Sequence, residues 1–264
     1  MTMPSTLLFD YGGTLDTAAV HWNFILLEAY HHQGLHEVDG EAWREAYVFG
    51  ERALARSPLI LPTDDFFSLL LKKVKLELHW LLTHRQVNLP LLHGESHTDV
   101  SLSAAVYPAA VPALSGEAAA MAEAIARYCD DKVRQRMAES RSVLETLRER
   151  GHRMVLVTNF YGNIQAVLRS YALDGFFDTI VESAVVGVRK PDAAIWRLGV
   201  EAAQRTPEGC IAIGDSFDKD ILPARAAGCR TVWFKGVEWN DVQRDEDIPD
   251  YIITALPEIL DLPL

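Results

Sequence analysis

Four stretches of the chain place residues that can bind a metal ion or a phosphoryl group just after a predicted strand. They contain Asp10, the pair Thr158-Asn159, Lys190 in Arg189-Lys190-Pro191-Asp192, and Asp215 with Asp220. Carboxylates suit Mg²⁺, which takes oxygen ligands. A lysine and a hydroxyl suit a phosphoryl group, whose charge must be neutralised during transfer. An aspartate beside Mg²⁺ can attack phosphorus and form an aspartyl-phosphate, so these residues together predict phosphoryl-transfer chemistry.

The first of these stretches reads Leu7-Leu8-Phe9-Asp10-Tyr11-Gly12-Gly13-Thr14-Leu15-Asp16. Its apolar run predicts a buried strand that delivers Asp10 to the edge of a sheet. The glycines permit a tight turn and a close approach of the backbone to something small. We therefore expect Gly13 and Thr14 to bind substrate beside Asp10, with Asn159 contributing from the second stretch.

The elements that must position these residues are short apolar strands that alternate with helices. Such alternation predicts an α/β fold with a doubly wound parallel sheet. Ligands bind such sheets outside the carboxyl ends of the strands, so the four stretches should meet there. We expect strands over 7–9, 154–158, 179–184, 210–214, 231–234 and 251–253, and helices over 164–171, 193–203 and 220–227.

A mostly helical block separates the first strand from the others. We expect helices over 20–55 with a break at Gly34, over 66–82 after an N-cap at 63–65, and over 117–150, where two helices are predicted. Residues 88–106 have weak periodicity and are predicted to form a loop. The predicted organisation is a catalytic core from 1–17 and 140–264, with residues 18–139 inserted as a helical cap.

In order and spacing, these motifs resemble those of the haloacid dehalogenase-like (HAD) hydrolase superfamily, in its branch with a helical (C1-type) cap. The resemblance covers residues 5–16 and about 140–264. It implies a Rossmann-like core and a Mg²⁺-dependent phosphatase in which Asp10 is the nucleophile and Thr158 and Lys190 are catalytic. The implied metal ligands are Asp10, the backbone carbonyl of Gly12, Asp215 and Asp220.

Gly12 departs from the family pattern, which has a second aspartate at this position. In the family that aspartate protonates the leaving group and later activates the attacking water, and such a general acid–base contributes typically about 10²–10⁴-fold. Glycine keeps the backbone carbonyl and lacks the carboxyl group. Metal binding and attack by Asp10 are therefore expected to survive, and activity on simple phosphate esters is expected to be weak.

Several interpretations of Gly12 remain open. Another acid, such as Asp16, a cap histidine or the substrate itself, could replace the missing aspartate. A phosphonatase-like enzyme would use a Schiff base on a cap lysine, with Lys72, Lys73 and Lys75 as candidates. A haloacid dehalogenase proper works without metal, and the Asp215 and Asp220 pair argues against it. The remaining alternative is a non-catalytic or regulatory protein that binds metal or phosphate.

Composition limits the partners that the protein can have. The formal net charge of −12 opposes non-specific attraction to nucleic acid or to anionic membranes. The chain has no apolar run of the length that spans a bilayer and no basic N-terminal region typical of a signal peptide. Three scattered cysteines favour a reducing compartment. We expect a cytoplasmic protein whose partner is a small phosphorylated metabolite. Histidines such as His79, His84, His93 and His97 fit no metal-ligand spacing.

Overall fold

The computed structural model describes residues 5–84, 107–114, 116–240 and 242–264. The chain divides into two compact units, Met1–Trp22 with Val133–Leu264 (unit 1) and Asn23–Lys132 (unit 2). The predicted loop over 88–106, with His93 and His97, lies outside the described residues. None of the described helices has both the length and the apolar character that crossing a bilayer requires.

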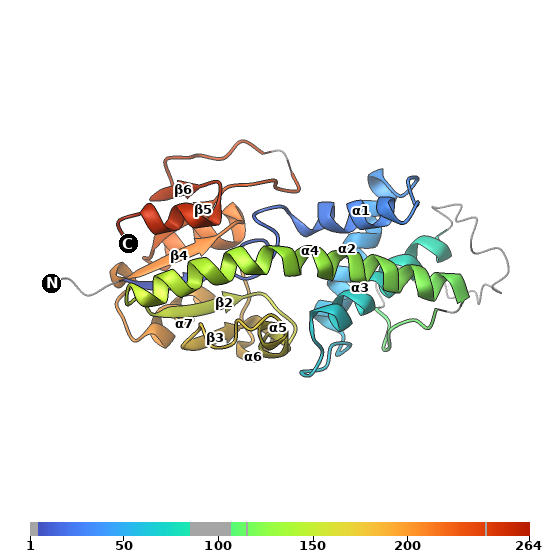
Figure 1. The fold of residues 1–264 in the computed structure, drawn as a ribbon, viewed down its shortest axis with the longest axis horizontal. Helices are drawn as coiled ribbons and strands as arrows, with labels where there is room; N and C mark the ends of the chain where they lie inside the picture. Colours follow the sequence, from blue (N-terminus) through green and yellow to red (C-terminus); the bar gives the residue numbers. More distant parts are fainter. Residues whose placement is uncertain (1–4, 85–106, 115, 241) are drawn as a thin grey trace. The chain divides into compact units, whose positions relative to one another are not determined.

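Unit 1 is built on one six-stranded sheet in the order β3-β2-β1-β4-β5-β6, in which every neighbouring pair is parallel (Figure 1). The prediction of an α/β fold with a parallel sheet is confirmed. Every residue of β2 and β4 is buried, as expected for apolar strands covered on both faces. The strands are β1 (Thr6–Phe9), β2 (Met154–Thr158), β3 (Thr179–Glu182), β4 (Cys210–Gly214), β5 (Arg230–Phe234) and β6 (Tyr251–Ile253).

The strand order reverses direction at the centre of the sheet. From β1 the chain adds β2 and β3 on one side, and then β4, β5 and β6 on the other. The two central strands pair directly, with Phe9 opposite Ile213, and the Asp10 N–H donates to the Ile213 carbonyl at 2.9 Å. Such a switch point is where open α/β sheets bind ligands. The carboxyl ends of β1 and β4 therefore define the site.

The helices of unit 1 are α5 (Ile164–Ser170), α6 (Ser183–Val186), α7 (Ala194–Ala203) and α8 (Leu222–Ala226), with short 3₁₀ segments at Pro207–Gly209 and Leu256–Asp261. Two predicted elements differ from the structure. The third strand ends at Glu182 and is followed by α6, and the predicted helix over 220–227 is a π-helical turn, η3 (Phe217–Ile221), followed by α8. Helix α7 packs closely on the sheet at Gly199, where an added Cβ would lie 2.7 Å from Val157.

Unit 2 contains α1 from Asn23 onward (Trp22–His32), α2 (Gly40–Arg56), α3 (Phe66–Thr83) and the first part of α4 (Gly116–Glu149). The break at Gly34 is confirmed, and Asp65 caps α3 by accepting from the Ser68 N–H at 2.8 Å. The prediction of two helices over 117–150 is wrong, because α4 is continuous (Figure 1). No glycine or proline interrupts it after Gly116, and its many alanines favour helix.

Candidate active site

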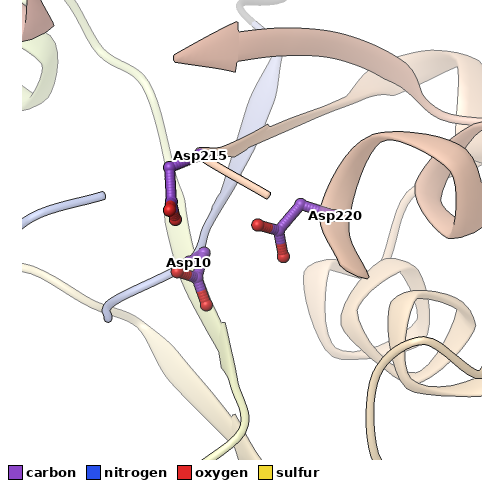
Figure 2. A group of neighbouring side chains, drawn as sticks. All are labelled: Asp10, Asp215 and Asp220. Carbon is purple, nitrogen blue, oxygen red and sulfur yellow. The ribbon is translucent and has the colours of Figure 1, made fainter. Parts of the chain in front are cut away.

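Three carboxylates converge at the switch point (Figure 2). Asp10 follows β1, Asp215 follows β4, and Asp220 lies in the π-helical turn η3. Each offers one oxygen, and these three oxygens lie within 4.8 Å of one another. Asp10 and Asp220 are buried, whereas Asp215 is half-buried. The structure thus brings together the three carboxylates that were predicted to bind metal.

Thr14 links two of these carboxylates. Its hydroxyl oxygen lies 3.1 Å from Asp10 Oδ2 and 3.1 Å from Asp215 Oδ1, and it accepts a hydrogen bond from the Asp215 N–H at 3.1 Å. The neighbouring Gly13 has a φ of +98°, and a Cβ added there would lie 2.3 Å from the Asp215 carboxylate. Only glycine therefore fits between the first loop and Asp215. The predicted contacts of Gly13 and Thr14 with a substrate stay predictions.

Gly12 contrasts with Gly13. It is exposed, and a Cβ added to it would have no other atom within 4 Å. Its backbone also lies outside the region of positive φ that disfavours other residues. A side chain could therefore be accommodated at position 12, and packing does not explain why this chain has glycine there. Gly12 as a metal ligand through its carbonyl stays a prediction.

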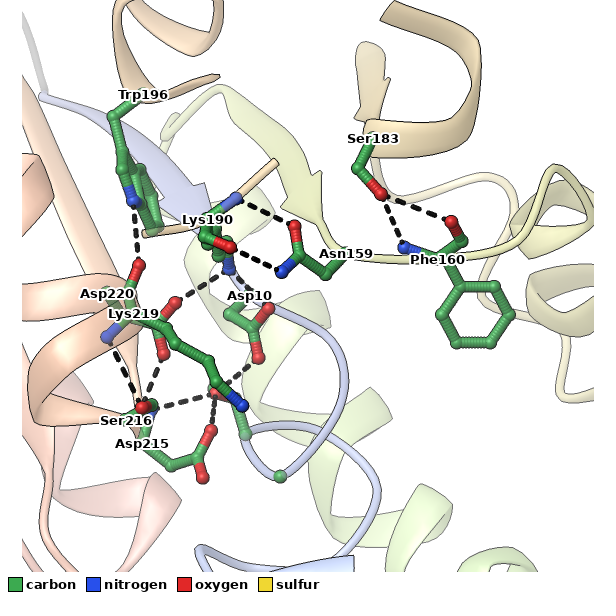
Figure 3. Close-up of polar contacts among 12 residues, drawn as sticks. Asp10, Asn159, Phe160, Ser183, Lys190, Trp196, Asp215, Ser216, Lys219 and Asp220 are labelled. Carbon is green, nitrogen blue, oxygen red and sulfur yellow. Dashed lines mark hydrogen bonds and ion pairs between the residues drawn. The ribbon is translucent and has the colours of Figure 1, made fainter. Parts of the chain in front are cut away.

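Lys190 joins the cluster from the segment between α6 and α7 (Figure 3). Its ammonium group lies 2.5 Å from Asp10 Oδ1 and 2.7 Å from Asp220 Oδ1, and its side chain is 2% exposed. Asn159 holds the lysine backbone: its amide donates to the Lys190 carbonyl at 3.0 Å and accepts from the Lys190 N–H at 2.9 Å. Asn159 thus positions Lys190, and its predicted contact with substrate stays a prediction.

Thr158 is placed by strand register. It is the last residue of β2, is 1% exposed and pairs with Glu182 of β3. Because Leu156 of β2 lies opposite Phe9, Thr158 ends β2 at the edge of the sheet where Asp10 follows β1. This places Thr158 at the predicted edge, and its catalytic role stays a prediction.

The turn that carries Asp215 and Asp220 is held by its own backbone and by two indole groups. The Ser216 N–H donates to Asp220 Oδ2 at 3.0 Å. The Trp196 indole donates to the Lys219 carbonyl at 3.3 Å (Figure 3). The Trp233 indole donates to the Asp215 carbonyl at 2.9 Å. Sequence reasoning missed both tryptophans, because an aromatic residue in an apolar element predicts core packing and does not indicate which carbonyl it contacts.

Two further acidic residues shape the loops around the site. Asp16, 1% exposed, accepts from the Gly13 N–H at 2.6 Å and from the Trp22 indole at 3.0 Å, and burial raises its pKa to about 7. Its two oxygens therefore hold the Gly13 backbone and the Trp22 side chain at the start of α1. Glu182 accepts from the backbone N–H groups of Gly162 and Ile164 at 2.6 and 3.3 Å. Its position in a predicted strand interior concealed this role.

The electrostatics of the cluster favour a cation. Burial raises the pKa of Asp10 to about 6, although Lys190 opposes the shift. Burial, followed by the nearby Asp220 and Asp10 carboxylates, raises the pKa of Asp215 well above its usual value. For Lys190, burial lowers the pKa, but the two carboxylates outweigh it and the pKa is raised. A bound divalent cation would offset both the burial and the mutual repulsion of the carboxylates. The oxygen donor set fits Mg²⁺.

Comparison with known proteins identifies the family. A family model for haloacid dehalogenase-like hydrolases matches residues 4–228. Because the match covers most of the 264 residues, the chain belongs to the haloacid dehalogenase-like hydrolases. This confirms the resemblance seen in the motifs. The interpretation of Gly12 as a substitution in the first motif and the assignment to the helical-cap branch stay predictions from the sequence.

Individual relatives cover less of the chain. A glyceraldehyde 3-phosphate phosphatase of Pyrococcus furiosus is 32% identical over 126 residues, which are 47% of this chain and 52% of that protein. A phosphoserine phosphatase of Thermus thermophilus is 32% identical over 112 residues, which are 42% of this chain and 45% of that protein. The chain spans about half the length of the curated relatives that it matches.

A solved structure resembles the whole fold. The magnesium-bound HAD hydrolase YfnB of Bacillus subtilis matches 98% of both chains with a TM-score of 0.55 and 19% sequence identity. At this identity the likeness shows the fold alone.

Proposed function

We propose that this protein is a Mg²⁺-dependent hydrolase that acts on a small phosphorylated substrate through an aspartyl-phosphate at Asp10. The observation that carries the proposal is the convergence of Asp10, Asp215 and Asp220 within 4.8 Å, with Lys190 in contact with two of them. The family membership supports hydrolysis, and the magnesium-bound HAD hydrolase of Bacillus subtilis supports the choice of metal.

In the proposed reaction, an Asp10 carboxylate oxygen attacks phosphorus, the bond from phosphorus to the alcohol oxygen breaks, and the phosphoryl group is transferred to Asp10. Water then attacks the same phosphorus, releases phosphate and restores the carboxylate. Mg²⁺ held by Asp10, the Gly12 carbonyl, Asp215 and Asp220 would supply Lewis-acid stabilisation of the developing charge. Lys190 is proposed to neutralise a phosphoryl oxygen, and Thr14, Thr158 and Asn159 are proposed to position the group.

The proposed weakness of this enzyme lies in proton transfer. The alcohol must gain a proton as it leaves, the attacking water must lose one, and Gly12 has no group for either step. Asp16 is an unsuitable replacement in the observed conformation, because its two oxygens accept hydrogen bonds from the Gly13 N–H and from the Trp22 indole. We therefore propose a substrate whose leaving group needs little protonation, or one that brings its own acid.

The substrate class follows from the relatives in outline only. The Pyrococcus furiosus and Thermus thermophilus proteins are named for small phosphorylated metabolites, glyceraldehyde 3-phosphate and phosphoserine. We propose a small phosphorylated metabolite for this chain as well, with unit 2 acting as the cap that selects it. A cytoplasmic location belongs to the same proposal. The described cysteines are free thiols, as a reducing compartment favours.

A phosphate-release screen tests the proposal. The unaltered protein is incubated with phosphate esters, acyl phosphates and phosphonates, with Mg²⁺ or with EDTA, beside Asp10→Asn. We expect release that requires Mg²⁺ and is lost in Asp10→Asn, with acyl phosphates turned over faster than simple esters. Release that continues in Asp10→Asn contradicts the nucleophile.

A binding or regulatory protein is the second candidate, and Gly12 is the observation that favours it. Retained Mg²⁺ affinity with no release from any substrate of the screen would support this alternative. The phosphonatase-like alternative has less support, since Lys72 pairs with Asp64 and Lys73 with Glu51 inside unit 2. Fast turnover of phosphonates alone would restore it.

A further inference from the structure

The loop between β5 and β6, described over residues 235–240 and 242–250, is attached to the rest of unit 1 near its start. The Val237 N–H donates to the Ala19 carbonyl at 2.7 Å, and the His21 N–H donates to the Val237 carbonyl at 2.9 Å. A Cβ at Gly236 would lie 2.1 Å from the Ala19 carbonyl oxygen, so the two segments approach as closely as backbones can. This attachment gives the loop a fixed base near the residues that follow the first motif.

Arg244 extends from this loop to the turn that carries Asp215 and Asp220. Its guanidinium donates two hydrogen bonds to Asp218, at 2.9 and 2.7 Å, and two to Glu238 Oε2, at 3.1 and 2.8 Å. The same group lies 5.3 Å from the centre of the Phe217 ring. Arg244 therefore contacts both of the first two residues of η3, and Asp220 lies in the same turn.

The geometry separates this contact from an ordinary surface ion pair, which contributes little. The Arg244 side chain is 17% exposed, against 57% for Asp218. Two parallel hydrogen bonds to one carboxylate fix orientation as well as distance. Glu238 of the same loop also accepts from the guanidinium, so Arg244 is held by its own loop as well as by Asp218. Phe217 is packed edge-on against Trp233, whose indole donates to the Asp215 carbonyl.

We propose that Arg244 is a positioning residue of the magnesium site, which fixes the η3 turn so that Asp220 and Asp215 meet Asp10 in ligand geometry. The inference rests on the proposed function, because it presumes that these carboxylates bind Mg²⁺. Arg244 itself pairs with Asp218 and Glu238, so it acts through the turn and not by contact with metal or substrate.

When the Arg244 cation is lost, a positioning role and a purely electrostatic role predict changes of opposite sign in Mg²⁺ affinity. Through charge alone, loss of the Arg244 cation would strengthen Mg²⁺ binding, since less positive charge would oppose the carboxylates. Through position, the same loss weakens binding, and partners that orient metal ligands are typically worth roughly 10- to 100-fold in affinity. Arg244→Lys keeps the charge and loses the paired hydrogen bonds. If Arg244 acts through geometry, Arg244→Lys should therefore bind Mg²⁺ as weakly as Arg244→Met.

The experiment measures Mg²⁺ affinity by isothermal titration calorimetry, without substrate. The variants are Arg244→Met, Arg244→Lys and Asp218→Asn, which removes the partner carboxylate, and circular dichroism checks that each is folded. Arg153→Met is the matched control, because Arg153 forms a 3.0 Å pair with Asp178 at the amino end of β2, away from the site. Asp215→Asn tests the metal site itself.

We expect the three variants at Arg244 and Asp218 to have a Mg²⁺ affinity at least roughly tenfold lower than that of the unaltered protein. The Mg²⁺ affinity of Arg153→Met should equal that of the unaltered protein. Equal or tighter binding by both Arg244 variants overturns the positioning role and leaves the proposed metal site intact. If Arg244→Met does not fold, Arg244→Lys decides by the same criterion, because Asp218→Asn removes a negative charge and would weaken Mg²⁺ binding through charge alone as well. Unchanged affinity in Asp215→Asn, or no binding by the unaltered protein, overturns the metal site and the inference together.

Discussion

Gly12→Asp should increase the rate at which this protein cleaves simple phosphate esters. Position 12 is exposed, a Cβ there has no other atom within 4 Å, and the backbone lies outside the positive-φ region. The aspartate therefore requires no repacking and no backbone strain. It would add a carboxyl group two residues after Asp10, in the loop that contacts Asp215 through Thr14.

The expected gain follows from general acid–base catalysis, which typically contributes about 10²–10⁴-fold. This corresponds to roughly 2.7–5.4 kcal/mol in activation free energy. The assay is steady-state release of phosphate from an alkyl phosphate and from an acyl phosphate with saturating Mg²⁺. The gain should be large for the alkyl ester and small for the acyl phosphate, because an acyl leaving group needs little protonation.

Gly12→Asn is the matched control, since asparagine has nearly the same shape and cannot donate and accept the proton. Gly12→Ala separates the effect of adding a side chain from that of adding a carboxyl group. If Gly12→Asp cleaves the alkyl ester no faster than Gly12→Asn, the reasoning about the missing acid is refuted. The acid would then come from elsewhere, or the site would have another task.

Three further predictions concern stability. Burial raises the pKa of the fully buried Glu77 from 4.5 to about 8. The folded state therefore favours the protonated form, and the free energy of unfolding falls as pH rises through that range. Glu77→Gln should remove this loss and gain about 1 kcal/mol or more at pH 9 relative to pH 6, measured by urea unfolding. Gly13→Ala should lower the free energy of unfolding by about 2 kcal/mol or more. Gly162→Ala should cost clearly less, because Gly162 also has a positive φ, +94°, but a Cβ there has no atom within 4 Å. Equal losses of stability in the two variants would contradict the clash with Asp215. Lys190→Met leaves two buried carboxylates without their cation and should lower the free energy of unfolding by about 3–5 kcal/mol in EDTA. Adding Mg²⁺ should raise the melting temperature of this variant more than that of the unaltered protein. An equal rise in both proteins would argue against a cation site.

The strand ends were predictable because each strand is a short apolar run that must be buried. Asp10, Asp215 and Lys190 follow such runs or lie in a polar loop after one, and a parallel sheet brings its carboxyl ends to one edge. Local chemistry therefore sufficed to predict the cluster. The sequence also indicated a close backbone approach at Gly13, and the structure adds that a Cβ there would lie 2.3 Å from the Asp215 carboxylate.

The features that sequence reasoning missed depend on contacts between distant residues. Trp196 of α7 donates to the Lys219 carbonyl, and Trp233 of β5 donates to the Asp215 carbonyl. Nothing in the local sequence of either tryptophan distinguishes it from a core residue. In unit 2, Lys73 was named only as a Schiff-base candidate. It is 4% exposed and paired with Glu51, because α2 packs along α3.

Helix α4 shows a different limit. Helix over this segment was predicted from its Ala, Glu and Arg content, together with a division into two helices, whereas the structure has one helix of 34 residues. No residue in the stretch is a helix breaker, and the chain continues helical from one unit into the other.

Covalent trapping at Asp10 tests the central claim most directly. The protein is mixed with acetyl phosphate and Mg²⁺, quenched in acid, digested and analysed by mass spectrometry, with Asp10→Asn and an EDTA sample in parallel. We expect a phosphoryl group on the peptide that contains Asp10, and none in either parallel sample. A phosphoryl group on another residue, or none on Asp10 while phosphate is released, would contradict it.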